Sequence, residues 1–432
     1  MKKKNNVAGH KKTKVILSTI LAIFIFLLGG VGGFLVNRLT KSNASNTIEE
    51  ILRIIDNVGY VYDEQTFEKK ELTAEELADA ILMALDDYAT YYTPEEYSNL
   101  LKKREGRYTN YGFGFYGEDL KIDVCYYNSP AFKAGVRRGD VIVGGRLSLE
   151  QENHTFTDVY DFINYYRTGN ADQTIYITLS RKGEFTEREF SFKPSQYEAV
   201  YVSYSDSEKT IHFEEKNDNR TAYLGESGIS GLPSDTAYID FVSFEGKAAA
   251  QLRDAVSIMK ENGKTSLILD LRNNGGGQIS ILEEVVGTLI YNEGKSNFPI
   301  IYEHHRNHTE ITYSAKNQNN DFIQKIVVLA NENTASASEC LIGAMSHYGN
   351  GVFSLDQLVV EKNNEGVART YGKGIMQTMY TLISGGAFTL TTAKLSWPDQ
   401  TTCIHGVGVR PTIIENAVEQ DDALLRAIEL LS

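Results

Sequence analysis

A serine at a strand-to-helix junction is the first residue in this sequence that could do chemistry. An apolar run at 326–330 is typical of a buried strand, and apolar residues from Ala337 onward fall at helical spacing, so Ser336 lies between the two. A nucleophile there gains from helical N–H groups, which stabilise the negative charge that develops on attack. With Glu339, the serine also matches a capping box, so a purely structural role is the alternative.

A glycine loop and a lysine could complete this chemistry. Three glycines at 275–277 follow an apolar strand at 267–271, and glycines let backbone N–H groups approach a ligand as an oxyanion hole requires. Lys373 would act as a base if burial lowered its pKa from about 10.4, and Gln377 falls on the same side of a strand or a helix. A plain glycine turn and a solvated lysine are the alternatives.

The pattern of the chain changes along its length. Threonine N-caps and apolar residues at helical spacing predict a small helical unit over 47–104. Short strands separated by glycine turns follow over 105–193. The polar segment 194–235 has no predicted role. From Ala237 onward strands alternate with helices, which predicts a central sheet covered by helices.

A second glycine loop, in the β-rich region, could bind a peptide end. The predicted contacts are Tyr111, Gly112, Phe113 and Gly114. Gly112, Gly114 and Gly117 also fit a dinucleotide-binding spacing, but that motif needs a helix directly afterwards and a strand follows instead. The order of elements over 105–193 resembles a PDZ domain, whose loop N–H groups hold a terminal carboxylate.

The amino terminus carries an uncharged apolar run at 15–36, long enough to span a bilayer as a helix. Six lysines within 1–14 predict, by the positive-inside rule, a cytoplasmic basic tail, a transmembrane anchor and an extracytoplasmic catalytic part. The prediction is therefore a single-pass protein of the cell membrane. A cleaved signal peptide is the alternative, but its apolar core is usually ~7–15 residues.

Charge and composition exclude other classes. The net charge of −14 argues against nucleic-acid binding, which needs a basic surface. The three cysteines are Cys125, Cys340 and Cys403. So sparse a set is no disulfide framework. His304, His305 and His308 suggest a metal only by spacing, outside the helical setting of a metalloprotease, so neither a metal nor a cofactor is predicted.

The order of these motifs and their residue sequences resemble those of the carboxyl-terminal processing peptidases, also called tail-specific proteases. The matching stretches are 267–277, 330–339, 371–377, 388–394 and 406–411, with 85–88 and 91–97 in the helical unit. With the PDZ-like region between them, the resemblance covers nearly all of the chain beyond the predicted anchor.

This resemblance implies a serine endopeptidase that recognises protein or peptide substrates by a free carboxyl terminus. The implied residues are Ser336 as nucleophile, Lys373 as general base, Gln377 as its support, and the N–H groups of Gly276 and Ala337 as oxyanion donors. Ser338 is the nearest rival nucleophile, but it occupies the second serine position of the motif.

Two departures from the family pattern bear on activity. Gly275 stands where the family usually has a proline, which should loosen the oxyanion loop. The stretch between Ser336 and Lys373 is longer than usual, with 361–369 as the expected insertion. The insertion matters for activity only if it displaces Lys373.

Two other functions are the alternatives. A Ser-His-Asp hydrolase would need His347 or His405 as its base, and neither has an evident acidic orienter. A catalytically degenerate, PDZ-bearing binding protein tethered to the membrane would have no need to keep the serine, the lysine, the glutamine and the glycine loop together.

The predicted fold class is α+β and multidomain. It comprises a transmembrane helix at 15–36, a helical unit at 47–104, a PDZ-like β-rich domain at 105–193, and an α/β peptidase domain at 194–432 that includes the connecting segment 194–235. The predicted partners are substrates with a free carboxyl terminus and the membrane, and a homo-oligomer is left open.

Overall fold

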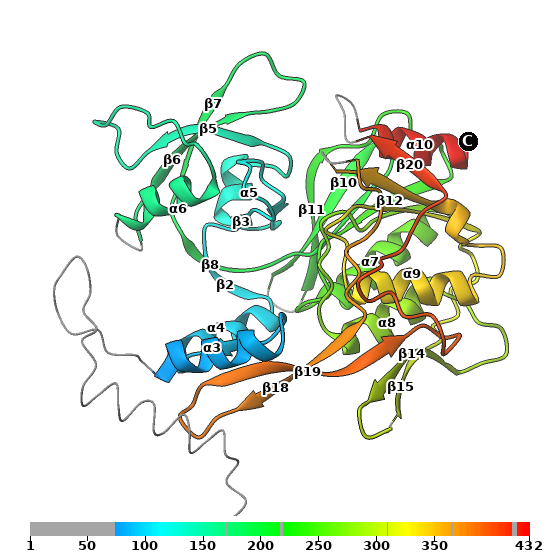
Figure 1. Cartoon of the computed structure of the whole chain (residues 1–432). Helices are drawn as coiled ribbons and strands as arrows, with labels where there is room; N and C mark the ends of the chain where they lie inside the picture. Colours follow the sequence, from blue (N-terminus) through cyan, green and yellow to red (C-terminus); the bar gives the residue numbers. More distant parts are fainter. Residues whose placement is uncertain (1–73, 170–171, 217–218, 309, 364–365, 417–420) are drawn as a thin grey trace, which may run out of the picture. The chain divides into compact units, whose positions relative to one another are not determined.

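The computed structural model describes residues 74–169, 172–216, 219–308, 310–363, 366–416 and 421–432 (Figure 1). The basic tail, the run at 15–36 and residues 47–73 of the helical unit lie outside these residues. No helix in the described ranges is long and apolar enough to cross a membrane; the longest, α7 (Ala248–Glu261), has 14 residues, against about 20 needed. The predicted transmembrane helix, and with it a single-pass membrane protein, is therefore corrected to an α+β fold with no membrane-spanning helix in its described part.

Residues 77–432 form one compact unit whose centre is an eight-stranded sheet. In spatial order its strands are β11 (Asn219–Ser227), β10 (Lys209–Lys216), β9 (Val202–Ser205), β12 (Thr236–Phe241), β13 (Ser266–Asp270), β16 (Lys325–Ala330), β17 (Leu358–Lys362) and β20 (Ile413–Asn416). The last five are parallel, whereas β9 and β10 pair antiparallel with their neighbours. The segment 194–235, which had no predicted role, thus supplies three strands of the central sheet.

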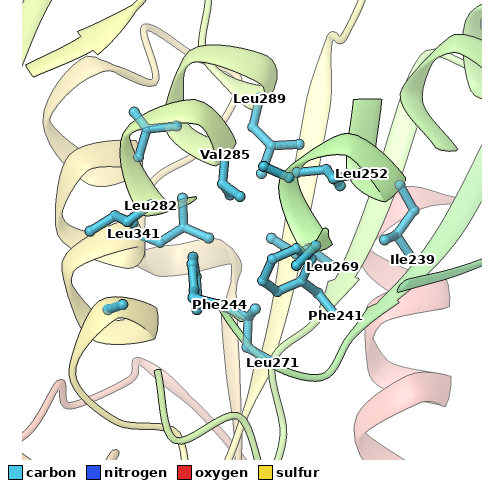
Figure 2. Packing of buried hydrophobic residues seen from close by; sticks show 14 of the residues in the cluster. Ile239, Phe241, Phe244, Leu252, Leu269, Leu271, Leu282, Val285, Leu289 and Leu341 are labelled. Carbon is cyan, nitrogen blue, oxygen red and sulfur yellow. The ribbon is translucent and has the colours of Figure 1, made fainter. Parts of the chain in front are cut away.

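Helices cover both faces of this sheet. Every residue of β12 and β13 is buried, as expected where helices pack on both sides of parallel strands. On one face lie α7, α8 (Ile279–Leu289) and α9 (Ala337–Tyr348), whose apolar side chains meet the strands around Phe244 (Figure 2). On the other face lies α10 (Asp422–Leu431), packed through Ala423 and Ala427. Each large side chain buried here stabilises the fold by about 1.5–3 kcal/mol.

A second sheet joins the amino-terminal part of the unit to the carboxyl-terminal part. Its strands are β1 (Thr90–Tyr92), β14 (Asn297–His305), β15 (Glu310–Lys316), β18 (Ile375–Thr381) and β19 (Ala387–Ser396). The antiparallel pair β18–β19 is the hairpin that the sequence predicts after residue 372. Because β1 and β18 both pair with β19, residues near 90 belong to the same sheet as the strand that follows Lys373.

The β-rich region has a core of its own. Its elements are β3 (Phe113–Gly114), β4 (Val124–Cys125), α5 (Pro130–Ala134), β5 (Val141–Arg146), α6 (Val159–Arg167), β6 (Ile175–Ser180) and β7 (Arg188–Phe192). Ser129 caps α5, and Gly135 ends it in the left-handed conformation. The strands β2 (Arg107–Asn110) and β8 (Ser195–Glu198) pair as a ribbon at its border.

Three short elements complete the described chain. They are α3 (Ala74–Leu85), α4 (Pro94–Arg104) and the 3-10 helix η1 (Leu355–Gln357). Helix α4 begins with the predicted capping box, in which Glu96 N–H donates to the Thr93 hydroxyl and Thr93 N–H donates to the Glu96 carboxylate.

Candidate active site

Ser336 lies at the end of the turn that joins β16 to α9, where the sequence places it. Its backbone has φ 56° and ψ −115°, whereas a residue that only caps a helix adopts β-region dihedrals. A non-glycine residue in a sparsely populated conformation costs about 1–3 kcal/mol and persists only where its surroundings impose it. The conformation of Ser336 is therefore held by contacts outside the residue itself.

A buried carboxylate provides these contacts. Glu339, one turn into α9, is fully buried and accepts four hydrogen bonds. Its Oε2 accepts from the backbone N–H groups of Ser336 and Lys373, each at 2.9 Å. Its Oε1 accepts from Gly372 N–H at 2.8 Å and from the Thr370 hydroxyl at 2.5 Å. One side chain thus fixes the nucleophile turn and the segment that carries Lys373 against each other.

The four donors also bear on the charge of Glu339. Burial raises its pKa above the ordinary value, and the hydrogen bonds from Thr370, Lys373, Ser336 and Gly372 act in the opposite direction. Since every partner is a donor, the site suits a carboxylate, which accepts on both oxygens. The expected insertion at 361–369 does not displace Lys373, because the Glu339 bond to its backbone is intact.

The amine of Lys373 lies between an amide and an aromatic ring. Its Nζ donates to Gln377 Oε1 at 3.0 Å and lies 5.5 Å from the centre of the Tyr88 ring. Gln377 in turn donates through Nε2 to the Tyr88 carbonyl oxygen. Tyr88 comes from the loop before β1, so the amino-terminal part of the unit helps to orient the predicted base.

Burial lowers the pKa of Lys373 from its ordinary value, and the negative charge of Asp86 partly opposes this effect. Asp86 is itself fixed by two backbone donors, Thr391 N–H at 2.7 Å and Tyr88 N–H at 3.0 Å. A lysine that loses its proton more readily can serve as a base nearer neutral pH. Burial of Lys373 thus acts in the direction that the sequence argument required, and its role as a base stays a prediction.

The glycine turn after β13 packs directly against the nucleophile turn. A Cβ added to Gly276 would lie 2.8 Å from the nitrogen of Ala337 and 2.9 Å from Ser336 Cβ, so only glycine fits there. Ala337 is the first residue of α9, a position whose N–H has no intrahelical acceptor. The structure therefore brings the predicted oxyanion residues to Ser336.

The Gly276 N–H, however, already has an acceptor. It donates to Asn274 Oδ1 at 2.9 Å. Asn274 is fully buried, and its Nδ2 donates to Phe241 O at 2.7 Å at the end of β12. The Asn274 carbonyl accepts from Ala335 N–H and from the Ser338 hydroxyl. Asn274 therefore links the glycine turn to the turn that carries Ser336. Its side chain also accepts from the Gly276 N–H, which an oxyanion would need as a donor.

An ion cluster anchors the base of the glycine turn. Asp270, the last residue of β13, pairs with Arg272 at 2.6 Å and with Arg138 at 3.1 Å. Burial would raise the pKa of Asp270, but the two guanidinium groups outweigh burial and hold it well below the ordinary value. Arg138 belongs to the β-rich region and also pairs with Asp240 of β12 at 3.3 Å. The cluster therefore fixes the β-rich region to the eight-stranded sheet.

The predicted carboxylate loop leads into strand β3. It comprises Tyr111, Gly112, Phe113 and Gly114. Gly112 has φ 90°, and an added Cβ would lie 2.1 Å from Ser129 Cβ, so this position requires glycine. The Phe113 ring contacts Phe162 of α6 edge-on. A Cβ added to Gly114 would meet nothing within 4 Å, which leaves open space beside the strand.

The rival residues do not assemble a different site at Ser336. His347 lies in the last turn of α9, at the far end of the helix from Ser336. His405 lies beside the segment of Lys373, and its ring contacts Tyr88.

The three neighbouring histidines do not form a metal site either. His304 and His305 each pair with a glutamate, Glu310 at 3.2 Å and Glu303 at 2.8 Å. No group of three or more potential metal ligands occurs in the part of the chain that is described.

Four residues at this site have roles that sequence reasoning missed. They are Asp86, Tyr88, Asn274 and Glu339. Glu339 was interpreted only as half of a capping box, although an acid three residues after the nucleophile was visible. Tyr88 reaches Gln377 from 289 positions away in the sequence, and no local signal predicts such a contact.

Comparison with known proteins adds an independent line of observation. The model of peptidase family S41 matches residues 235–414. The chain is 25% identical over 414 residues to a "Probable CtpA-like serine protease" of Staphylococcus epidermidis, covering 94% of this chain and 74% of that protein. It is 26% identical over 346 residues to the "C-terminal processing peptidase, chloroplastic" of Tetradesmus obliquus, covering 77% and 66%. A solved S41 protease from Bacteroides fragilis shares the fold, with a TM-score of 0.51 at 14% identity over 88% of this chain and 96% of that one.

Proposed function

The chain belongs to peptidase family S41 and is a serine-type endopeptidase of the carboxyl-terminal processing kind, and on that premise we propose that Ser336 and Lys373 form its catalytic dyad. The observation that carries this proposal is the shared carboxylate of Glu339, which binds the backbone N–H of both residues at 2.9 Å. Both N–H groups donate to the same atom, Glu339 Oε2, although Ser336 and Lys373 are far apart in the sequence.

In the proposed mechanism, neutral Lys373 takes the proton from the Ser336 hydroxyl as Ser336 Oγ attacks the scissile carbonyl carbon. Gln377 holds the amine in place through its 3.0 Å contact with Nζ and adds no charge. The tetrahedral intermediate collapses to an acyl-enzyme, and the ammonium of Lys373 gives its proton to the departing amine. Water then attacks the ester, with Lys373 again as base, and releases the second product.

Ala337 N–H and Gly276 N–H are the proposed donors to the oxyanion. For Gly276 this requires its hydrogen bond to Asn274 to be shared or exchanged when substrate arrives. The geometry supports such an exchange, because Gly276 already lies against Ala337 and has no side chain in the way.

We further propose that residues 105–193 form a PDZ-like domain that captures the free carboxyl terminus of the substrate. Strand β3 pairs with β4 alone among the described strands, which leaves an edge for an added strand. Gly114 has open space beside it, which leaves room for a carboxylate at the adjoining loop. The proposed reaction needs neither a metal nor a cofactor.

A serine-reactive phosphonate probe would test the nucleophile directly. The wild-type protein should be labelled at Ser336, and Ser336→Ala should lose both the label and cleavage of an unfolded protein substrate. Ser280→Ala, which changes an exposed serine in α8, is the matched control and should keep both. Activity should persist in a strong chelator. Labelling elsewhere, or cleavage by a folded Ser336→Ala protein, would contradict the assignment.

A further inference from the structure

A cavity of about 880 Å³ lies between α4, the β2–β8 ribbon and the hairpin of β3 and β4. Phe113 and Gly114 of the proposed carboxylate loop line it, and so does Tyr116. We call it the α4 cavity. The cavity is thus lined in part by β3, the strand to which a substrate tail would be added.

One residue that lines the α4 cavity, Tyr116, also contacts the glycine turn of the active site. The Tyr116 hydroxyl donates to Asn273 O at 2.9 Å, and a Cβ added to Gly275 would lie 3.7 Å from the same hydroxyl. Residues 113–116 therefore connect the tail loop with the residues that precede Gly276. A substrate held by its end at β3 has this cavity beside its path to Ser336.

The charge of the α4 cavity is opposite to that of the protein. Lys102, Lys103 and Arg107 line it, and no aspartate or glutamate is among its lining residues. The chain as a whole has a net charge of −14. Both lysines are exposed, and Lys102 Nζ donates to Asn99 Oδ1 at 3.4 Å, whereas Arg107 pairs with Glu105. A cationic cavity in an acidic protein is complementary to an acidic ligand.

A second cavity on the other side of Tyr116 has the reverse character. It measures about 520 Å³, and Tyr116 is part of the lining of both cavities. Its acidic lining residues are Glu118, Asp119, Asp123, Glu332 and Glu361, against the two lysines Lys121 and Lys362. An acidic peptide segment would be repelled there and attracted to the α4 cavity. The two cavities together would therefore favour one orientation of the substrate, with its acidic segment in the α4 cavity.

We propose that the α4 cavity binds acidic side chains in the carboxyl-terminal segment of the substrate and so selects tails that carry aspartate or glutamate upstream of the terminus. This inference rests on the proposed function, since it names the substrate class of the same site. The occupant is a peptide: the cavity continues from a strand edge, and the hydrogen-bonding groups of Thr109, Asn110 and Gln196 also line it.

Binding can be tested apart from catalysis in the Ser336→Ala protein. Three fluorescent peptides would share one sequence and one apolar free terminus and differ in two upstream residues, Glu-Glu, Gln-Gln or Lys-Lys. We expect the Glu-Glu peptide to bind about 3- to 10-fold more tightly than the Gln-Gln peptide at low salt, and the difference to shrink as salt rises. Equal affinities for the two peptides would overturn the proposal.

Variants then assign the preference to the cavity. Lys102→Gln/Lys103→Gln keeps good helix formers in α4 and should bring the Glu-Glu to Gln-Gln ratio close to one. Lys133→Gln, which changes an exposed lysine on α5 outside the cavity, should leave that ratio as in the wild type. An unchanged ratio in the double variant would overturn the proposal. If that variant does not fold, by circular dichroism, Arg107→Gln serves in its place.

The active enzyme separates this inference from the proposed function. Wild-type protein that binds Glu-Glu peptides preferentially yet cleaves none of the three would contradict the proposed dyad and leave the charge preference standing. Wild-type protein that cleaves all three with equal kcat/KM, and loses cleavage in Ser336→Ala, would support the dyad and overturn the acidic-tail specificity.

Discussion

The two turns that meet at the active site are built in different ways. Strands β13 and β16 are parallel neighbours, and each runs through a turn into a helix at the same edge of the sheet. After β16 the unusual backbone belongs to Ser336, and the side chain of Glu339 holds it. After β13 it belongs to Asn273, Gly276 and Gly277, with φ 61°, 95° and 145°. The turn after β16 presents the side chain of Ser336, whereas the turn after β13 presents backbone groups without a side chain at Gly276 and Gly277.

The two turns also differ in what they offer a substrate. Ser336 is partly exposed, and its backbone is already fixed. The Gly276 N–H donates to Asn274, and the Gly276 carbonyl accepts from Phe244 N–H at 2.9 Å. Exchanging one such hydrogen bond for another costs little net free energy, about 0.5–1.5 kcal/mol if the first is simply lost. In the proposed mechanism the turn that carries Ser336 is therefore ready, and turnover depends on a small rearrangement of the glycine turn.

Removing the chemistry of the nucleophile turn should have the largest effect. Ser336→Ala and Lys373→Ala should each lower kcat by about 10⁴-fold or more, and the double variant should be no worse, because residues that act as one unit are not additive. The measurement is single-turnover cleavage of an unfolded protein, with thermal unfolding as the control for folding. Additive losses in the double variant would show that the two residues act separately.

The next largest effect should come from the glycine turn. In Gly276→Ala the added methyl group would lie 2.8 Å from both the Ala335 oxygen and the Ala337 nitrogen, at a φ of 95°. Losing one oxyanion donor costs about 10²–10³-fold in kcat, so a loss of this size with little change in KM is expected. Gly275→Ala is the matched neighbour, and an equal loss in both variants would contradict a special role for Gly276.

Glu339→Gln tests what holds the nucleophile turn. The amide nitrogen of glutamine would face backbone donors that now bind a carboxylate oxygen, so one or two buried N–H groups would lose their acceptor. We expect a loss of about 1–3 kcal/mol in the free energy of unfolding and, through misplacement of Ser336, about 10- to 100-fold in kcat. Glu293→Gln, an exposed change, is the control. Full activity in Glu339→Gln would mean that Ser336 keeps its strained backbone by other means.

The residues that belong to short sequence motifs could be predicted, whereas the residues that position them through hydrogen bonds were missed. Ser336, Lys373 and Gln377 follow from short patterns, and the structure brings them together, although their catalytic roles stay predictions. Asn274 drew no attention within the glycine loop, yet its side chain and its carbonyl take part in four hydrogen bonds that reach three separate segments. Such contacts depend on the register of parallel strands, which a single sequence does not specify.

The same limit applies to the fold. The alternation of strands and helices from Ala237 onward was predicted, because fully buried parallel strands have a continuous apolar pattern. Strands β9 to β11 were missed, because their segment is rich in polar residues and turns. The transmembrane helix was predicted from apolar length alone, and no helix in the described ranges has the length it needs.

The pH dependence should respond to a residue outside both turns. The negative charge of Asp86 raises the pKa of Lys373 against the lowering effect of burial. Asp86→Asn removes this charge and keeps an acceptor for one of the two backbone N–H groups that Asp86 binds, so the pKa of Lys373 should fall further. The acidic limb of kcat/KM against pH should then move to lower pH. A limb that stays in place, or moves to higher pH, would show that Lys373 is not the titrating base.

The smallest effect should come from stiffening the glycine turn without touching its donor. Gly275 is exposed, its φ lies outside the left-handed region, and the nearest atom to an added Cβ is the Tyr116 hydroxyl at 3.7 Å, an ordinary contact. Gly275→Ala should therefore stabilise the protein by about 0.4–1 kcal/mol, because the unfolded chain loses conformational freedom. Chemical denaturation measures this change. If turnover needs the Gly276 amide to leave Asn274, the same variant should also lower kcat, by about 3-fold or less, since each 1.4 kcal/mol is tenfold in rate. A destabilised Gly275→Ala protein would show instead that the turn is held in a backbone conformation that alanine cannot adopt.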